Sequence, residues 1–327
     1  MNVLVTGAAG FIGYHVSNAL LARGDTVCGL DNLNNYYRVD LKQARLNKLT
    51  AHEKFQFEKI DLADRASMAQ LFELHKFDAV LHMGAQAGVR HSLEQPHDYV
   101  DANLAGLVNL LEGCRHGQPK HLVFASSSSV YGEQADVPFR ESDPVDHPVS
   151  LYAATKKAGE LMAHSYSHLY GLAITCLRFF TVYGPWGRPD MAYFKFADAM
   201  CAGQPIEVFN EGQMERDFTF IDDVVTGILK VLELPPQSTP NEAAYRIFNL
   251  GRGNPIKLMD FIQILATTLG KKSELIMKPM QPGDVTRTWA DTSALQKATG
   301  YEPHTSLEQG IKLFAEWYLG EWKESQK

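Results

Sequence analysis

The sequence has few cysteines and no long apolar run, and both absences exclude classes of protein. Its 327 residues contain four cysteines, none in a CxxC pair: Cys28, Cys114, Cys176 and Cys201. We interpret them as reduced thiols, two of them in apolar, strand-like runs. No segment reaches the ~18 apolar residues of a membrane span, and a strand-like run begins the chain without a basic leader. We therefore expect a soluble cytoplasmic protein.

The chain also lacks an excess of positive charge. Its net charge is −7 at pH 7, which gives no general attraction to nucleic acid or to an anionic membrane. Any anionic ligand must then be held by local features. The histidines show no metal-ligand spacing, so we predict no catalytic metal.

Short apolar runs alternate with amphipathic stretches through the first half of the chain. Helical periodicity marks the stretches between the runs, for example Val16–Arg23 and Ser67–His75. This alternation predicts an α/β fold with a doubly wound parallel sheet, helices covering both of its faces. The runs that we predict to be strands are Val3–Thr6, Thr26–Asp31, Phe55–Asp61, Ala79–His82, His121–Ser126 and Ala173–Phe179.

A glycine-rich run, TGAAGFIG, joins the first predicted strand to the first helix. Gly7, Gly10 and Gly13 permit a tight turn, a close backbone approach to a pyrophosphate, and close packing of the helix on the strand. The helix that begins at Phe11 and Ile12 offers N–H groups and a positive dipole end to phosphates. Because strand and helix are both present, the run predicts a dinucleotide site of the Rossmann type.

Polar residues after the second and third strands fit the rest of such a cofactor. Asp31 can accept hydrogen bonds from a ribose diol, with Asn32 beside it, and would repel a 2′-phosphate. NAD is therefore favoured over NADP, although Arg38 in the following loop could soften the repulsion. Asp61 and Leu62 follow the third strand, where an adenine would lie. The alternative for Asp61 is a cap of the next helix.

Tyr152 and Lys156, in the run YAATK, stand four residues apart in a segment with helical periodicity. On a helix, this spacing places both side chains on one face. A free tyrosine has a pKa of ~10, and a nearby ammonium and a nicotinamidium would both lower it. Tyr152 would then serve as a general base toward a sugar hydroxyl. The run Ser126–Ser129 follows an apolar strand and would deliver a hydroxyl to the edge of the sheet where ligands bind.

The runs TGAAGFIG, SSSSVYG and YAATK, in this order, resemble the extended short-chain dehydrogenase/reductases, and together they cover essentially the whole chain. The resemblance implies that Tyr152 is the base and that Lys156 binds the nicotinamide ribose and tunes Tyr152. It implies that Ser127 bonds the reacting hydroxyl, with Ser128 as the alternative. Asn103 matches the family's helix asparagine of structural and proton-relay type, and its alternative is a buried polar residue without such a role.

The serine run also bears on the reaction. Relatives that dehydrate or decarboxylate commonly carry Asp or Glu directly after this strand end, and Ser126–Ser129 is followed by Val130. The run therefore favours reversible oxidation, which means epimerisation at C4. Tyr152 would take the proton from O4 while a hydride passes from C4 to NAD. The ketone would rotate, and the hydride would return to its other face.

Two further runs, GAQAGVRHS and RFFTVYGPWGRPDMA, resemble those of UDP-glucuronate 4-epimerases. We assign Gln86 of the first run to the cofactor and Arg90 to the phosphates. In the second run, Thr181 stands where glucose-type epimerases usually have an Asn-containing loop. A C6 carboxylate beside a C4 ketone is a β-keto acid that loses CO2 easily, so an epimerase must hold it. Arg188 would hold the carboxylate by a bidentate pair, with a hydroxyl contact from Thr181.

Other interpretations remain open at this stage. Arg188 could be a surface arginine, and the enzyme could be a UDP-glucose or UDP-N-acetylhexosamine 4-epimerase. A sugar-nucleotide decarboxylase, a dehydratase, and a non-catalytic NAD(H)-sensing protein are further alternatives, the last disfavoured because Tyr152 and Lys156 are intact.

The diphosphate contacts rest on the resemblance alone. Arg216 resembles the family's arginine toward the diphosphate or ribose, and its alternative is an ion pair with Asp217 or Asp222. Gln281 stands where glucose-type epimerases often place an arginine, so Arg287 is the candidate for the second contact.

The later half of the chain predicts a second, smaller unit. A loop rich in Gly and Pro covers 183–189, shorter elements follow, and Ile247–Leu250 reads as a strand that returns to the sheet. We predict a Rossmann domain over residues 1–180 and a mixed α/β substrate-binding lobe over residues 181–327. The predicted helices 98–115 and 151–169 carry apolar stripes that could form a four-helix bundle in a homodimer. Alternatively, both stripes cover the sheet.

Overall fold

A computed structural model describes residues 1–281 and 283–324. In this part of the chain, seven parallel strands form a central sheet, in the order β10-β6-β5-β4-β1-β2-β3. With β10 added at one edge, this is the order of a doubly wound Rossmann sheet, so the predicted fold class is confirmed. The strands are β1 (Asn2–Thr6), β2 (Thr26–Leu30), β3 (Phe55–Glu58), β4 (Ala79–His82), β5 (His121–Ser127), β6 (Ile174–Phe179) and β10 (Tyr245–Leu250).

The central strands are continuous apolar runs because both faces of the sheet are covered. Every residue of β4, β5 and β6 is buried. The predicted returning strand is present as β10, where Ile247 lies opposite Cys176 of β6 in parallel register. One predicted boundary is wrong: β3 ends at Glu58 rather than Asp61, because the chain turns there and the Ile60 N–H bonds to the Glu58 carbonyl at 3.1 Å.

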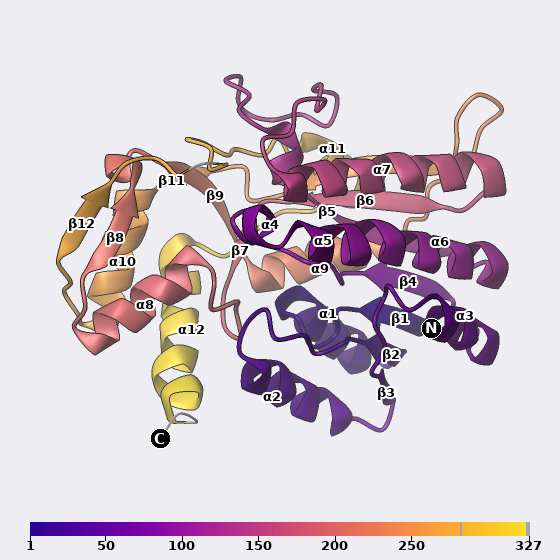
Figure 1. Cartoon of the computed structure of the whole chain (residues 1–327), viewed down its shortest axis with the longest axis horizontal. Coiled ribbons are helices and arrows are strands. Elements are labelled where there is room, and N and C mark those ends of the chain that lie inside the picture. The colour runs from indigo at the N-terminus through magenta and orange to yellow at the C-terminus, as the bar shows by residue number, and fades with distance from the viewer. Residues whose placement is uncertain (282, 325–327) are drawn as a thin grey trace.

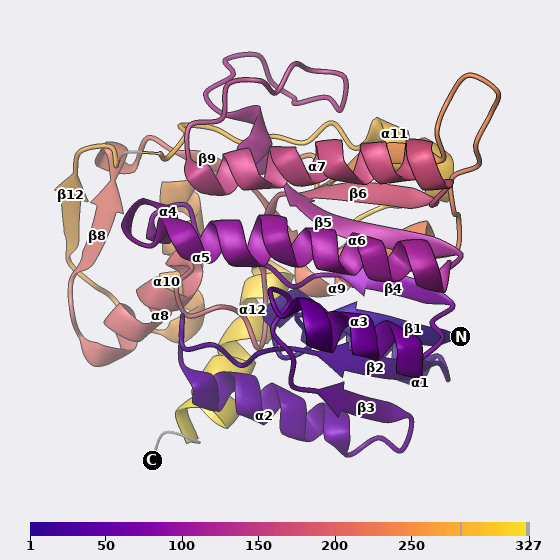
Figure 2. The same cartoon turned by 45° about the vertical axis from the view of Figure 1, so that its right-hand side comes forward.

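Helices pack on both faces of the sheet (Figures 1 and 2). On one face lie α3 (Arg65–Leu74), α6 (Gly106–Gly117) and α7 (Leu151–Tyr170), which are in front of the strands in Figure 2. On the other lie α1 (Phe11–Ala22), α2 (Val39–Thr50) and α9 (Ile221–Leu232). Although α9 comes from the later half of the chain, it packs against α1 and β5. Among the described helices, none combines the length and apolarity that a bilayer crossing requires.

The helix predicted over 98–115 is divided into three segments. They are α5 (Pro96–Val100), the π-helical turn η1 (Asp101–Ala105) and α6. Asn103 lies in the π-helical turn and is buried, and such turns are frequent at functional sites. The apolar stripe is divided as well, since Leu107 and Leu111 are buried whereas Val100 is 42% exposed.

On α7 the predicted stripe does not cover the sheet. The residues of α7 that are buried are mostly small or polar, namely Ala153, Thr155, Lys156, Gly159, Glu160, Ala163 and Ser167. Leu161, a member of the stripe, is 59% exposed, and Leu169 is 62% exposed. The alternative that both stripes merely cover the sheet is therefore wrong for α7.

A smaller unit lies beyond the carboxyl ends of the central strands, on the left in Figure 1. It contains a three-stranded sheet, in the order β11-β9-β7, and the parallel pair β8 and β12. Its strands are β7 (Thr181–Tyr183), β8 (Ile206–Phe209), β9 (Glu215–Phe220), β11 (Pro255–Lys257) and β12 (Leu275–Lys278). Its helices are α8 (Ala192–Ala202), α10 (Leu258–Leu269) and α12 (Leu307–Trp317). Short segments elsewhere in the described chain and in this unit are α4 (His91–Glu94), η2 (Ser128–Tyr131), η3 (Asn210–Gly212), α11 (Ser293–Thr299) and η4 (Tyr318–Trp322), of which α4, η2 and α11 pack against elements of the Rossmann unit.

Candidate active site

The glycine loop between β1 and α1 has no room for side chains. Gly7 has a φ of +68°, and a Cβ there would lie 2.7 Å from the Gly84 Cα. A Cβ on Gly13 would lie 2.0 Å from the Gly7 carbonyl oxygen. Gly10 caps α1 without a side-chain hydrogen bond, and the N–H groups of a first turn, which here begins at Phe11, have no partner within the helix. This loop fits the pyrophosphate of a dinucleotide.

Asp31, directly after β2, is buried beside this loop. Its carboxylate accepts the backbone N–H groups of Leu33 at 2.8 Å and Ala9 at 3.2 Å. Burial raises the pKa of Asp31, and these two hydrogen bonds oppose that rise. The carboxylate therefore connects the glycine loop to the end of β2, where the ribose of a dinucleotide would lie.

Asn32 and Asp61 meet at the ends of β2 and β3. The Asn32 Nδ2 donates to an Asp61 carboxylate oxygen at 2.8 Å, and Leu62 next to it is buried. The N-cap of α3 is Asp64, whose side chain accepts from the Ala66 and Ser67 N–H groups. The alternative that Asp61 caps this helix is therefore wrong.

Asn103 and Gln86 form a buried pair that joins two other elements. The Asn103 Oδ1 accepts the Gln86 backbone N–H at 2.8 Å, and its Nδ2 donates to the Gln86 carbonyl and to the Thr155 Oγ1, both at 3.0 Å. The amide of Asn103 thereby fixes the loop after β4 against α7. The buried Nε2 of Gln86 has no hydrogen-bond partner in the described part of the chain. A buried orphan donor of this kind fits an acceptor on a bound cofactor.

Tyr152 and Lys156 lie one turn apart at the start of α7. Ser150 caps this helix, its Oγ accepting the Ala153 N–H at 3.1 Å. The Lys156 Nζ donates to the Ala125 carbonyl at 2.9 Å and lies 5.9 Å from the centre of the Tyr152 ring. Burial lowers the pKa of Lys156 to about 8. The two side chains therefore share one face of the helix, next to the end of β5.

The electrostatics of Tyr152 differ from those expected. Burial raises the pKa of Tyr152, and the groups that oppose the rise are the Ser127 hydroxyl and the Arg188 charge. The expected lowering by Lys156 is thus not seen in the protein alone. Ser127 is well placed for its role because its Oγ, besides facing Tyr152, accepts the Ser129 N–H at 3.1 Å. Ser128, the alternative, is half-buried in the turn η2.

A buried ion pair lies beneath these residues, and the sequence analysis missed it. Arg178 of β6 donates to both carboxylate oxygens of Glu160, at 2.8 and 2.9 Å. Ser126 also donates to Glu160, at 2.7 Å, and Tyr131 accepts from Arg178 at 3.0 Å. A signal was present, because Glu160 follows Lys156 by one further helical turn. This network fixes the strand end that carries Ser127.

Arg188 is held by a second unpredicted partner, Asp190. Its Nε donates to the Asp190 Oδ1 at 3.0 Å and its Nη2 to Oδ2 at 2.5 Å, and the Tyr36 hydroxyl donates to the same Oδ2 at 3.0 Å. The side chain of Arg188 is 23% exposed, so it is not the surface arginine of the alternative interpretation. Its guanidinium lies close enough to Tyr152 for its charge to oppose the rise in the pKa of that hydroxyl. Thr181 is half-buried at the start of β7.

The remaining arginines belong to the smaller unit and its border. The Arg216 Nη1 donates to the carbonyls of Glu215, at 2.9 Å, and Thr286, at 3.2 Å. The alternative ion pair of Arg216 with Asp217 is wrong, because the buried Asp217 carboxylate instead accepts backbone N–H groups of Arg252, Gly253 and Ala290.

Arg90 and Arg287 are each about half exposed. Arg90 pairs with Asp284 at 3.1 Å, and Arg287 pairs with Glu215 at 2.6 Å. The Oε1 of Gln281 is buried without a hydrogen-bond partner in the described residues. Gln281 therefore has an open acceptor, which cannot by itself bind a phosphate oxygen.

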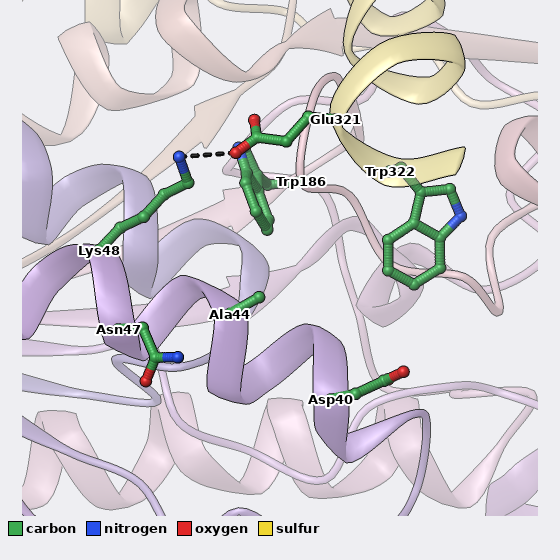
Figure 3. A pocket seen from close by; sticks show the side chains of 7 residues that line it. All are labelled: Asp40, Ala44, Asn47, Lys48, Trp186, Glu321 and Trp322. Atoms are coloured by element: carbon green, nitrogen blue, oxygen red, sulfur yellow. Dashed lines mark ion pairs between the residues drawn. The ribbon is translucent and has the colours of Figure 1, made fainter. Parts of the chain in front are cut away.

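Two features of the described residues concern other parts of the molecule. No group of three or more His, Cys, Asp or Glu side chains is arranged to hold a metal ion. A surface pocket of about 320 Å³ opens between α2 and η4, away from Tyr152 (Figure 3). Its lining consists of Asp40, Ala44, Asn47, Lys48, Trp186, Glu321 and Trp322.

Comparisons with known proteins agree with this geometry. The chain is 50% identical to UDP-glucuronate 4-epimerase 3 of Arabidopsis thaliana, over 100% of this chain and 78% of that protein. A crystal structure of UDP-glucuronic acid 4-epimerase from Bacillus cereus, with UDP-glucuronic acid and NAD, matches with a TM-score of 0.89 and 34% identity, covering 97% of this chain and 98% of that one. The UDP-glucose 4-epimerase of Thermotoga maritima matches with a TM-score of 0.88 and 31% identity, covering 100% of both chains.

A family model spans the whole Rossmann sheet. The model described as the NAD dependent epimerase/dehydratase family matches residues 3–251, from the first strand of the sheet to the residue after β10. The chain belongs to the NAD-dependent epimerase/dehydratase family.

Proposed function

We propose that this protein is a UDP-glucuronate 4-epimerase, which forms UDP-galacturonate through a transient 4-keto sugar. The observation that carries the proposal is the position of Arg188. This cation is fixed by Asp190 and lies close enough to Tyr152 for its charge to lower the pKa of the hydroxyl. The similarity to proteins named UDP-glucuronate 4-epimerases supports the same substrate.

The reaction divides between the cofactor and this chain's residues. Bound NAD supplies a hydride acceptor that can return the hydride, so that no net oxidation occurs. Tyr152 removes the proton from the sugar O4 and later returns it, while the Ser127 hydroxyl orients O4. Lys156 is held by the Ala125 carbonyl, where its ammonium can bind the nicotinamide ribose.

The choice of a uronate follows from Arg188. Two of its nitrogens, Nε and Nη2, are bound to Asp190. We assign Nη1 and the Thr181 hydroxyl to the sugar carboxylate. Fixing this carboxylate in the plane of the C4 ketone prevents loss of CO2, because decarboxylation needs the breaking bond perpendicular to that plane. The strand end contributes no carboxylate for dehydration, since serines occupy positions 126–129.

Incubation with UDP-glucuronate, without added NAD, tests this function directly. We expect NMR of the sugar anomeric protons to show UDP-galacturonate, because NAD is regenerated in each cycle and stays bound. Conversion of UDP-glucose or UDP-N-acetylglucosamine alone would assign the protein to the neutral-sugar epimerases, which it also resembles in fold.

The Arg188→Ala variant tests the carboxylate contact. We expect kcat/KM for UDP-glucuronate to fall about 100-fold, since a charge-assisted contact to the sugar carboxylate is lost. A UDP-pentose should appear as a side product. The role of Arg188 is disproved if uronate affinity and turnover stay unchanged.

We also propose a homodimer through α5–α6 and α7. The exposed Val100, Leu161 and Leu169 support it, because large apolar side chains on two neighbouring helices favour burial against a second copy. Sedimentation equilibrium of the protein and of Leu161→Glu measures this, and a monomeric wild type at micromolar concentration would disprove it.

A further inference from the structure

Arg45, on α2, is fully buried without an acidic partner. None of its side chain is exposed, and within the described residues it has no ion pair. Its donors bind neutral oxygens instead. Its Nε and Nη2 reach the Trp186 carbonyl at 3.0 and 2.6 Å, and Nη2 also reaches the Gly187 carbonyl at 2.9 Å. Nη1 donates to the Ala9 carbonyl at 2.9 Å and to the Tyr37 hydroxyl at 2.8 Å. A cation is costly to bury, so this placement needs a reason.

The backbone carbonyls that accept from Arg45 belong to two loops that approach the active site from different units. Ala9 lies in the glycine loop that fits the cofactor, whereas Trp186 and Gly187 directly precede Arg188. The guanidinium therefore ties the cofactor loop to the loop that presents the uronate contact. The hydrogen bonds of Arg45 thus hold the backbone directly before Arg188.

The loop before Arg188 has a conformation that needs support. Trp186 has a φ of +58°, in the left-handed region that a non-glycine residue seldom adopts. Its carbonyl is held by Arg45, and its indole packs against Tyr14 and Trp317, with ring centroids 5.7 and 5.3 Å apart. Figure 3 shows the indole beside the ion pair of Lys48 and Glu321. The backbone and the side chain of Trp186 are thus each fixed by separate contacts.

Two adjacent tyrosines extend the connection. Tyr37 accepts from Arg45, and Tyr36 donates to Asp190, which holds the Arg188 fork. Both tyrosines lie in the loop that follows Asp31 at the cofactor site. A shift of this loop would move the support of Arg45 and of Arg188 together.

We propose that Arg45 is a positioning residue for uronate specificity: it fixes the loop of Trp186 and Gly187 so that Arg188 meets the sugar carboxylate. This inference rests on the proposed function and names a residue that acts through Arg188. Arginine is required because the nitrogens of its planar guanidinium donate to several separated oxygens at the same time. The ammonium of a lysine is a compact charge that cannot reach all of them.

Binding measurements on Arg45→Lys test the inference. We would measure the dissociation constants of UDP-glucuronate and UDP-glucose by calorimetry, and the melting temperature of each variant. Arg65→Lys, the same change on an exposed residue of α3, is the matched control. Because a small misplacement of a contact is costly, we expect UDP-glucuronate to bind about tenfold more weakly to Arg45→Lys. UDP-glucose binding should change less than about twofold, and a UDP-pentose should appear during turnover of UDP-glucuronate.

A milder variant covers the case in which Arg45→Lys does not fold. Tyr37→Phe removes one acceptor of the fork, and we expect about threefold weaker UDP-glucuronate binding with the same selectivity. Equal weakening of both ligands, or no change in either variant, overturns the inference while leaving the proposed function intact. A wild type that converts no UDP-glucuronate overturns both.

Discussion

Charged groups at the end of the central sheet and charged groups at the border of the smaller unit are held in different ways. Glu160 and Arg178 are each 1% exposed, and they bind one another and the neighbouring Ser126 and Tyr131 hydroxyls inside the fold. Arg90 and Arg287 are nearly half exposed, and each has a single carboxylate neighbour. The buried pair is occupied by partners within the fold, whereas each exposed arginine could bind a ligand in addition to its carboxylate or in place of it.

This difference separates positioning from recognition. A buried, fully satisfied network is rigid, so it suits the strand end where Ser127 must face Tyr152. A paired but accessible arginine keeps its charge available to a ligand at low cost. Arg188 lies between the two cases, because it is 23% exposed and bound by Asp190 on one edge only. We expect variants of the two regions to affect different quantities.

The largest effect is expected at Tyr152. Replacing it by Phe removes the hydroxyl that we propose moves the O4 proton, so kcat should fall about 10³-fold. The dissociation constant of UDP-glucuronate and the melting temperature should stay close to the wild-type values. Rapid-quench turnover combined with calorimetry separates these quantities. Residual activity within tenfold of the wild type would assign the base to another group.

The next effect concerns stability rather than turnover. Glu160→Gln leaves the Arg178 guanidinium buried without its counter-charge, and we expect a loss of about 3–5 kcal/mol in the free energy of unfolding. The matched control is Glu316→Gln, in an exposed pair with Lys312 at 4.0 Å, where we expect less than about 0.5 kcal/mol. Urea titration measures both. Similar losses in the two variants would remove the distinction between the regions.

The smallest effect is expected for the exposed arginines. Arg90→Ala and Arg287→Ala should raise KM for the nucleotide sugar by less than about threefold without a change in kcat, because exposed charges are screened. The rise should shrink as NaCl is increased to roughly 0.5 M, where the screening length is short. Steady-state kinetics at two salt concentrations measure it. A salt-independent rise above tenfold would place these side chains in direct contact with the substrate.

Residues whose signal is local could be predicted from the sequence, and residues whose partners are distant could not. The glycine loop and the Tyr152–Lys156 pair lie in short runs, and the helix or turn that carries them also sets their geometry. Arg45 bonds to residues 141 and 142 positions away. Nothing in the run LKQARL indicates this role, because the acceptors lie in a distant part of the sequence.

Electrostatic expectations failed for a similar reason. The spacing of Tyr152 and Lys156 indicates a shared helix face but says nothing about burial, and burial is the largest influence on the pKa of both. The end of β3 and the π-helical turn at Asn103 were missed because a one-residue change in backbone hydrogen bonding leaves no trace in the apolar pattern.

The returning strand β10 also constrains how the protein is made. This strand pairs with β6 at one edge of the sheet. The family model extends to residue 251 and so includes it. When β6 has been synthesised it therefore still lacks its neighbour on one side, and at roughly 10 residues per second several seconds pass before β10 follows. During this interval the unpaired edge of β6 can form strand pairs with another nascent chain on the same mRNA. The order of the strands along the chain therefore leaves β6 unpaired on one side until the residues of β10 have been synthesised.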